Sequence, residues 1–148
     1  MVAWYDKTNT TQELLWDAGE VDAGAPGAEE SFILWNNRGG PVDVSDMENV
    51  RLTARDAGGD IEGDLVLGLW TEVRVDEQGE MEFTPVGGNT YHGLSNGITP
   101  GVIRGLANDG TLPAADPNTC LLTLRLNPAP GATPGSRAWL VGAFYRYV

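Results

Sequence analysis

The residue types that carry out acid–base and nucleophilic chemistry are scarce in this chain. Among its 148 residues, His92 is the only histidine and Cys120 the only cysteine. A catalytic triad needs a base beside its nucleophile, and this histidine lies in a short loop that ends at Gly93. One histidine and one cysteine also cannot supply the three or four nitrogen and sulfur ligands of a zinc site. The sequence therefore predicts a protein without enzymatic activity, without a metal and without a cofactor.

Carboxylates are the one reactive group that the chain holds in quantity, with 21 Asp and Glu residues. A pair of acids can cleave glycosides, but spacing in sequence does not reveal which two converge. The densest acidic segment, residues 56–64, places carboxylates at positions 60, 62 and 64, a spacing that superficially suits calcium. It departs from the EF-hand pattern because its glycine lies at position 63 and no glutamate follows at the required distance. A solvated turn is the preferred interpretation, and calcium binding is the alternative.

Five tryptophans and four tyrosines are available to stack on sugars or to anchor a protein interface. Trp35, Trp70 and Trp139 lie within expected strands, where burial in the core is the favoured outcome. Aromatic residues nearer to loops or chain ends are the expected contact residues, because aromatic side chains are enriched at the centres of interfaces. With one arginine, the predicted interface residues are Trp4, Tyr5, Trp16, Tyr91, Arg137, Tyr145 and Tyr147.

The formal net charge of −12 argues against a nucleic-acid partner and against an anionic membrane, because phosphate binding requires clustered Lys and Arg. The charge is unevenly distributed. Residues 1–116 hold every carboxylate, whereas residues 117–148 hold Arg125, Arg137 and Arg146 and no acid. Opposite ends of one chain can therefore attract a second copy or an oppositely charged partner. The alternative is that buried C-terminal strands simply exclude acidic side chains.

Residues 1–7 lack the basic stretch and apolar run of a signal peptide, and no segment approaches the length of a membrane span. We therefore expect synthesis in the cytoplasm. A single cysteine allows no intrachain disulfide, and Cys120 opens an alternating strand, so core packing is its expected role.

Alternation of apolar and polar residues recurs along the chain and predicts β-strands joined by glycine- and proline-rich turns. Residues 139–148 are apolar on both faces, which predicts a strand that is central in its sheet or lies at an interface. A hairpin is expected from residues 70–75 and 80–84, with a loop at 76–79. The other expected strands are residues 14–16, 31–35, 50–55, 66–69 leading into 70–75, 120–126 and, as an extra short strand, 102–103.

The number of short strands, about seven to nine, favours an all-β fold, an antiparallel β-sandwich of Ig-like or jelly-roll type, with a barrel as the alternative. Residues 1–27 are expected to form an N-terminal arm with a short strand, and residues 28–148 a single sandwich domain. The stretch 85–119 is expected to be mostly long loops, which often contact partners.

Several segments resemble Ig-like adhesion and surface domains. In residues 30–40 a strand ends in Asn37-Arg38-Gly39, and in residues 46–56 the next begins after Asn49-Val50; residues 122–135 resemble the strand and proline–glycine turn that precede the final strand. Such sandwiches are usually exported from bacteria, yet this chain has no export signal. Tailed-phage virion proteins are made in the host cytoplasm and face the outside, and the chain resembles these.

The resemblance implies a non-enzymatic structural subunit of a phage virion, with the virion as its location. A capsid decoration (cement) protein that docks on the major capsid protein is the first expectation, and it would form a homo-oligomer such as a trimer. An accessory protein of the tail or baseplate is the alternative. A carbohydrate-binding module and a glycoside hydrolase are the rival classes, the first expected to be a monomer with exposed aromatics and the second to have two carboxylates in a cleft.

Overall fold

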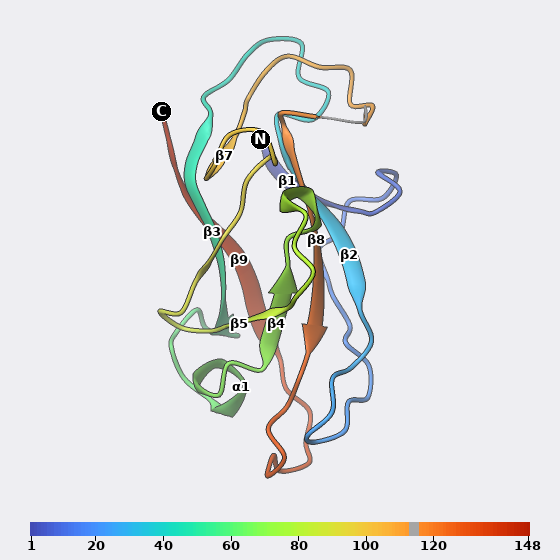
Figure 1. Ribbon diagram of the computed structural model, residues 1–148, viewed down its shortest axis with the longest axis vertical. Helices are drawn as coiled ribbons and strands as arrows, with labels where there is room; N and C mark the ends of the chain where they lie inside the picture. Colours follow the sequence, from blue (N-terminus) through green and yellow to red (C-terminus); the bar gives the residue numbers. More distant parts are fainter. Residues whose placement is uncertain (113–115) are drawn as a thin grey trace.

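The computed structural model describes residues 1–112 and 116–148. Two antiparallel sheets pack face to face (Figure 1). Sheet A has the strand order β1-β2-β8-β4-β5, and in sheet B β3 is central, with β9 along one edge and the short β6 and β7 along the other. The strands of sheet A are β1 (Val2–Asp6), β2 (Glu30–Asn36), β8 (Thr119–Leu126), β4 (Thr71–Arg74) and β5 (Thr84–Val86). Those of sheet B are β3 (Met47–Asp56), β6 (His92–Gly93), β7 (Val102–Ile103) and β9 (Trp139–Tyr147).

The predicted all-β sandwich is confirmed, and alternation explains its core. In β2 and β8, Leu34 lies opposite Cys120 and Phe32 opposite Leu122, and all four side chains are buried between the sheets. Leu52 of β3 meets them from sheet B and is fully buried. Each such side chain contributes about 1.5–3 kcal/mol by leaving water. Cys120 takes the core role that the sequence predicts, and burial raises the pKa of its thiol.

Three predicted strands differ from the structure. Residues 14–16 form no regular element, and the strand of the N-terminal arm is β1, which pairs with β2 along its whole length. Residues 66–69 form no strand: 66 and 67 end a short helix, α1 (Asp64–Leu67), and 68 and 69 form the turn after it. In the predicted hairpin the return strand is β5 and begins at Thr84, so residues 80–83 are not part of it. A 3-10 turn (Asp76–Gln78) follows β4 instead of a tight hairpin loop.

Local backbone geometry and short-range hydrogen bonds explain the last two differences. The backbone of Leu69 has a φ of 56°, which ends the helix before β4 and which a strand would not tolerate. After the 3-10 turn Glu80 makes two hydrogen bonds to Val75: its carboxylate accepts from the Val75 N–H, and its own N–H donates to the Val75 carbonyl at 3.3 Å, without starting a ladder. Neither feature has a signal in local alternation.

β9 is an edge strand, not a central one. It pairs with β3 alone among the described residues, over the register Asp56↔Trp139 to Met47↔Tyr147. The expectation of a central strand is therefore wrong. The alternative, that β9 lies at an interface, stays a prediction and is compatible with its partly uncovered apolar side chains.

Four asparagines hold the loops at one end of the sandwich. Asn37 donates from Nδ2 to the carbonyl of Val42 at 2.8 Å and to that of Gly105 at 3.1 Å. Asn118 donates to the carbonyl of Leu106 at 2.7 Å, and Asn36 and Asn108 make similar bonds to nearby carbonyls. The described part of stretch 85–119 is thus largely fixed by side-chain hydrogen bonds, although most of it is outside the ladders as expected.

No helix among the described residues is long and apolar enough to cross a membrane.

Candidate functional site

The predicted interface residues do not come together in one site. Their environments differ because they lie on different strands and on both sides of the sandwich. Trp4 and Trp16 line a cleft between the sheets, Tyr5 lies under Arg38, Tyr91 lies on the outer face of sheet B, Arg137 lies near α1, and Tyr145 and Tyr147 lie near the end of β9.

The cleft of Trp4 and Trp16 is small and largely filled by aromatic contacts. Both rings stand edge-on to Phe32, each with centroids 6.5 Å apart, and Trp16 also meets Trp139 at 5.4 Å. A volume of about 180 Å³ remains beside β9. The two tryptophans therefore close the open side of the sandwich, and the N-terminal segment takes part in the core that it covers.

Two of the predicted contact residues are already engaged within the chain. The guanidinium of Arg38 lies 4.2 Å from the ring centroid of Tyr5. Arg137 binds both carboxylate oxygens of Asp64, at 2.8 Å and 2.6 Å, and lies 4.8 Å from the ring centroid of Trp70. The ion pair holds the pKa of the Asp64 carboxyl below its ordinary value. Arg137 thus fastens the loop before β9 to the start of α1.

The outer face of sheet B carries a compact group that we call the arginine–aromatic cluster, made of Arg51, Arg55, Tyr91 and Phe144. Arg51 lies 4.5 Å from the ring centroid of Tyr91, and Arg55 lies 5.3 Å from that of Phe144. Arg55 also donates to the Tyr91 hydroxyl at 2.8 Å, and the two rings meet edge to face at 5.6 Å. The residue opposite Thr53 in β9 is Gly142, which the Phe144 ring approaches.

Side chains on both faces of β9 are exposed, and we call these the β9 surface. Leu140 is 50% exposed, Tyr147 52% and Val148, just past the strand, 65%. Because β9 has no second ladder partner among the described residues, the same strand also presents unpaired backbone groups. The β9 surface consists of Leu140, Phe144, Tyr145, Tyr147 and Val148.

The sequence-based reasoning missed one motif: residues 93–97, Gly-Leu-Ser-Asn-Gly, have the Gly-x-Ser-x-Gly spacing of a nucleophile elbow. The motif requires a strand that turns into a helix, but Gly93 ends a two-residue strand and bends and turns follow it. Ser95 is 4% exposed, and its hydroxyl accepts a hydrogen bond from the N–H of Gly97 at 3.2 Å. Nε2 of His92 lies 2.8 Å from a Glu80 oxygen, which pairs the histidine with a carboxylate.

The acidic loop behaves as a turn in the structure. The Asp56 carboxylate accepts hydrogen bonds from the N–H groups of Gly58 and Asp60, at 3.0 Å and 2.7 Å. Within residues 1–112 and 116–148, no group of three His, Cys, Asp or Glu side chains is placed to hold a metal ion. The Asp56 carboxylate therefore stabilises the backbone of the turn that follows it.

Arg51, Arg55 and Phe144 are surface residues that the sequence-based reasoning did not select. A signal was available, since Arg51 and Arg55 occupy the polar face of a strand predicted from alternation. Their meeting with Tyr91 and Phe144 depends on β3 pairing with β6 on one side and β9 on the other, which no local pattern specifies.

Comparisons of the chain with protein-family models, with curated proteins and with solved structures give no match.

Proposed function

We propose that this chain is a non-enzymatic assembly subunit that docks on other protein subunits through the side of the sandwich formed by β9. The observation that carries the proposal is the β9 surface, an edge strand with exposed apolar side chains on both of its faces. Open edges of this kind are normally shielded by charges, prolines or covering segments. Clustered exposed apolar side chains mark interaction surfaces.

A virion is the setting that the Ig-like resemblance favours, with a decoration protein of the head as the first candidate and a tail or baseplate accessory as the second. In either place the subunit would contact the major capsid protein or tail proteins and would form a homo-oligomer. The setting predicts that the chain is present in stoichiometric amounts in purified particles. Its absence from such particles would contradict this part of the proposal.

A carbohydrate-binding role has weaker support. It needs aromatic faces open to a sugar, but the Tyr91 ring lies beneath Arg51 and the Tyr5 ring beneath Arg38. Trp16 and Trp139 pack edge to face against each other, so these rings contact one another and do not form a flat platform for a sugar.

The docking surface is tested with Tyr145→Lys/Tyr147→Lys, which places charge on the β9 surface without touching the buried core. Light scattering and sedimentation velocity should detect association of the unmodified chain and its loss in this variant. Met81→Lys is the matched control, because Met81 is exposed on a loop away from β9 and its replacement should leave association unchanged. Equal association by all three proteins would contradict the proposal.

A further inference from the structure

We propose that the partner at this side of the molecule is a second copy of the chain, whose acidic segment, residues 13–22, docks on the arginine–aromatic cluster. The inference rests on the proposed assembly role and names the partner and the chemistry of the contact. Carboxylates of the segment would pair with Arg51 and Arg55, and its exposed leucines would lie against the neighbouring β9 surface. The contact joins two different surfaces, so it links copies head to tail.

The first observation is that the two arginines of the cluster have no acidic partner. Arg74, Arg104, Arg125, Arg137 and Arg146 each form an ion pair with a carboxylate of the chain. Among the described residues, neither Arg51 nor Arg55 has a carboxylate oxygen within ion-pair distance, and the buried Nε of Arg55 has no hydrogen-bond partner. In a chain of net charge −12, two adjacent unpaired arginines form a local positive site.

The second observation is that aromatic rings hold these arginines in place. Tyr91 lies against both: its ring faces Arg51, and its hydroxyl accepts a hydrogen bond from Arg55. Phe144 supports Arg55 and the edge of Tyr91. A guanidinium that is already oriented loses less side-chain entropy on binding, and its planar donors match a carboxylate. The cluster is thus suited to acidic side chains that project from a neighbouring apolar segment.

The third observation is that residues 13–22 have the complementary composition. They contain Glu13, Asp17, Glu20 and Asp22 and no basic residue, and none of these four carboxylates forms an ion pair among the described residues. The segment has no helix or ladder strand from residue 13 onward. Leu14 and Leu15 are 89% and 81% exposed, so the acids flank apolar side chains that the chain itself leaves uncovered.

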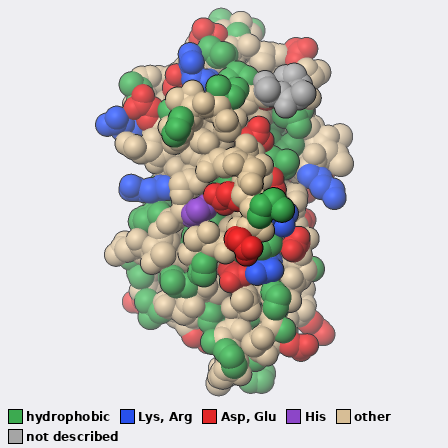
Figure 2. Space-filling model, viewed as in Figure 1, with side chains coloured by type: hydrophobic (Ala, Val, Ile, Leu, Met, Phe, Trp, Pro, Cys, Tyr) green, Lys and Arg blue, Asp and Glu red, His purple; other side chains and the backbone are tan. Residues whose placement is uncertain are grey.

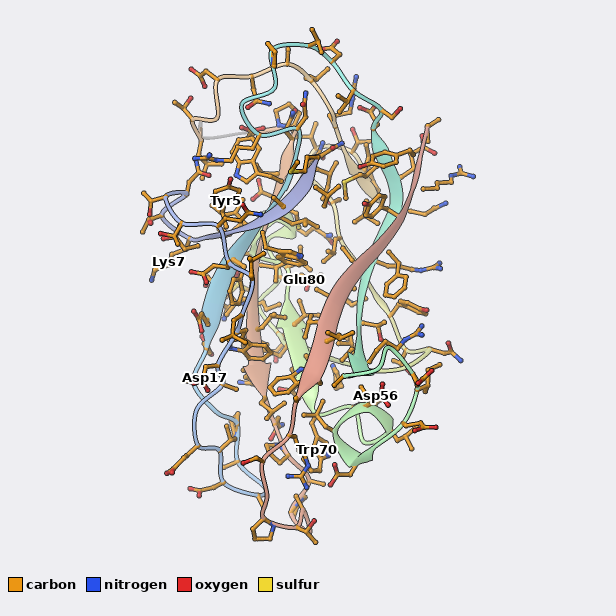
Figure 3. All side chains as sticks on the ribbon, turned by 180° about the vertical axis from the view of Figure 1, so that it is seen from behind. Tyr5, Lys7, Asp17, Asp56, Trp70 and Glu80 are labelled. Atoms are coloured by element: carbon orange, nitrogen blue, oxygen red, sulfur yellow. The ribbon has the colours of Figure 1, made fainter. Side chains whose placement is uncertain are left out.

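Within one copy residues 13–16 line the cleft beside Leu140 and Val141 of β9, whereas the cluster lies on the outer face of sheet B. Figure 3 places Asp17 on the side of β1 and β2, and Asp56, which ends β3, on the other side. Figure 2 shows basic side chains projecting from the margin on which β3 lies in Figure 1. An acidic segment of one copy therefore reaches the cluster of another copy more directly than its own. Repeated head-to-tail contacts produce a ring if the rotation closes and a filament if it does not.

The test uses two charge-reversed variants of the full chain. Arg51→Glu/Arg55→Glu destroys the basic half of the contact and keeps the acidic half, and Asp17→Arg/Glu20→Arg does the opposite. Each variant alone should be monomeric, with self-association weakened by at least about 100-fold, because the reversed charges repel what they formerly paired. An equimolar mixture should regain association, because the intact acidic segment of the first variant meets the intact cluster of the second and the two reversed surfaces again carry opposite charges. Glu62→Arg/Glu82→Arg adds the same charge elsewhere and should associate like the unmodified chain.

The outcomes separate this inference from the proposed function. If either reversed variant associates as well as the unmodified chain, or if the mixture stays monomeric while both variants are folded by circular dichroism, the inference is wrong. Arg51→Gln/Arg55→Gln gives a milder second test if the glutamate variant does not fold. Loss of association in Tyr145→Lys/Tyr147→Lys but not in the charge-reversed variants would support docking through β9 and overturn the acidic-segment contact.

Discussion

Asn37 connects the end of β2 to two loops that lie far from it in sequence. Its amide donates to the carbonyls of Val42 and Gly105, and its backbone has a φ of 62°. Asn37→Ala would leave buried carbonyls without donors and place a Cβ-bearing residue in the left-handed region, where asparagine is better tolerated. We expect the free energy of unfolding to fall by about 2–4 kcal/mol, measured by urea denaturation.

Asn37→Gly separates the two causes of that loss. Glycine adopts a positive φ without strain but cannot donate the hydrogen bonds. It should therefore be more stable than Asn37→Ala and less stable than the unmodified chain. A glycine variant as stable as the unmodified chain would contradict the role given to the amide.

Glu77 makes the stability of the fold depend on pH. Burial raises the pKa of its carboxyl above the ordinary value of 4.5, and the negative charges of Asp116 and Asp76 raise this pKa further. The hydrogen bond from the N–H of Leu121 acts in the opposite direction but does not cancel the increase. A carboxyl whose pKa is higher in the folded state than in the unfolded state adds to the free energy of unfolding. This contribution is complete at a pH below the unfolded-state pKa and is lost as the pH rises through the folded-state pKa.

Glu77→Gln removes this pH dependence while keeping an oxygen that can accept the Leu121 hydrogen bond, 3.1 Å long in the structure. We expect the variant to gain stability relative to the unmodified chain as pH rises from about 4 to 7. Chemical denaturation at several pH values measures the difference. A difference that stays constant with pH would show that Glu77 titrates alike in the folded and unfolded states.

At the scale of the elements, one ion pair links β4 to β8 directly across the ladder. Arg125 lies opposite Glu72 in register, with Nε 2.6 Å from a carboxylate oxygen that is nearly buried. Asn127 donates to the other oxygen at 3.1 Å, and Arg125 also lies 3.9 Å from the Phe83 ring centroid. The pair therefore joins two neighbouring strands on the outer face of sheet A.

Removing one member of this pair should cost more than removing both. Arg125→Met keeps the stem over Phe83 but leaves the Glu72 carboxylate buried and unpaired, which should cost about 3 kcal/mol of unfolding free energy. Glu72→Met/Arg125→Met should recover at least about 1 kcal/mol of that loss. A double-mutant cycle by denaturant unfolding measures the coupling, and strictly additive losses would contradict it.

At the scale of the whole molecule, the N-terminal segment is part of the sandwich. β1 pairs with β2 throughout, and Trp4 and Trp16 both cover Phe32. A chain that starts at residue 28 should lose at least about 3 kcal/mol of stability, because it exposes the aromatic side chains that these tryptophans cover. Thermal and urea unfolding of the shortened chain test this expectation. Unchanged transition midpoints would mean that residues 28–148 are a self-sufficient domain.

Much of this architecture follows from the sequence alone. Alternation in 50–55 and 120–126 predicts β3 and β8, because a half-buried strand must place apolar side chains on one face, and the short apolar run in 31–35 predicts β2. Those strands bring Leu34, Leu52 and Leu122 together, so the two-layer core is also implied. Cys120 is buried for the same reason, so these features are local in origin and need only a second sheet to complete them. Trp35 and Trp70 are buried outside this core, Trp35 on the other face of β2, where its indole N–H donates to Asn9, and Trp70 against α1.

Other features were decided by the tertiary structure, because they depend on which strands become neighbours. The apolar composition of β9 is compatible with a central strand and with an edge strand, and it is an edge because β3 is its one ladder partner in residues 1–112 and 116–148. The helix at Asp64–Leu67 forms where Val66 and Trp70 close one end of the core. A short apolar segment of this kind is compatible with a helix and with a strand, so its sequence does not distinguish the two. The arginine–aromatic cluster likewise exists only because β6 and β9 bring Tyr91 and Phe144 to the polar face of β3, so side chains distant in sequence share one surface.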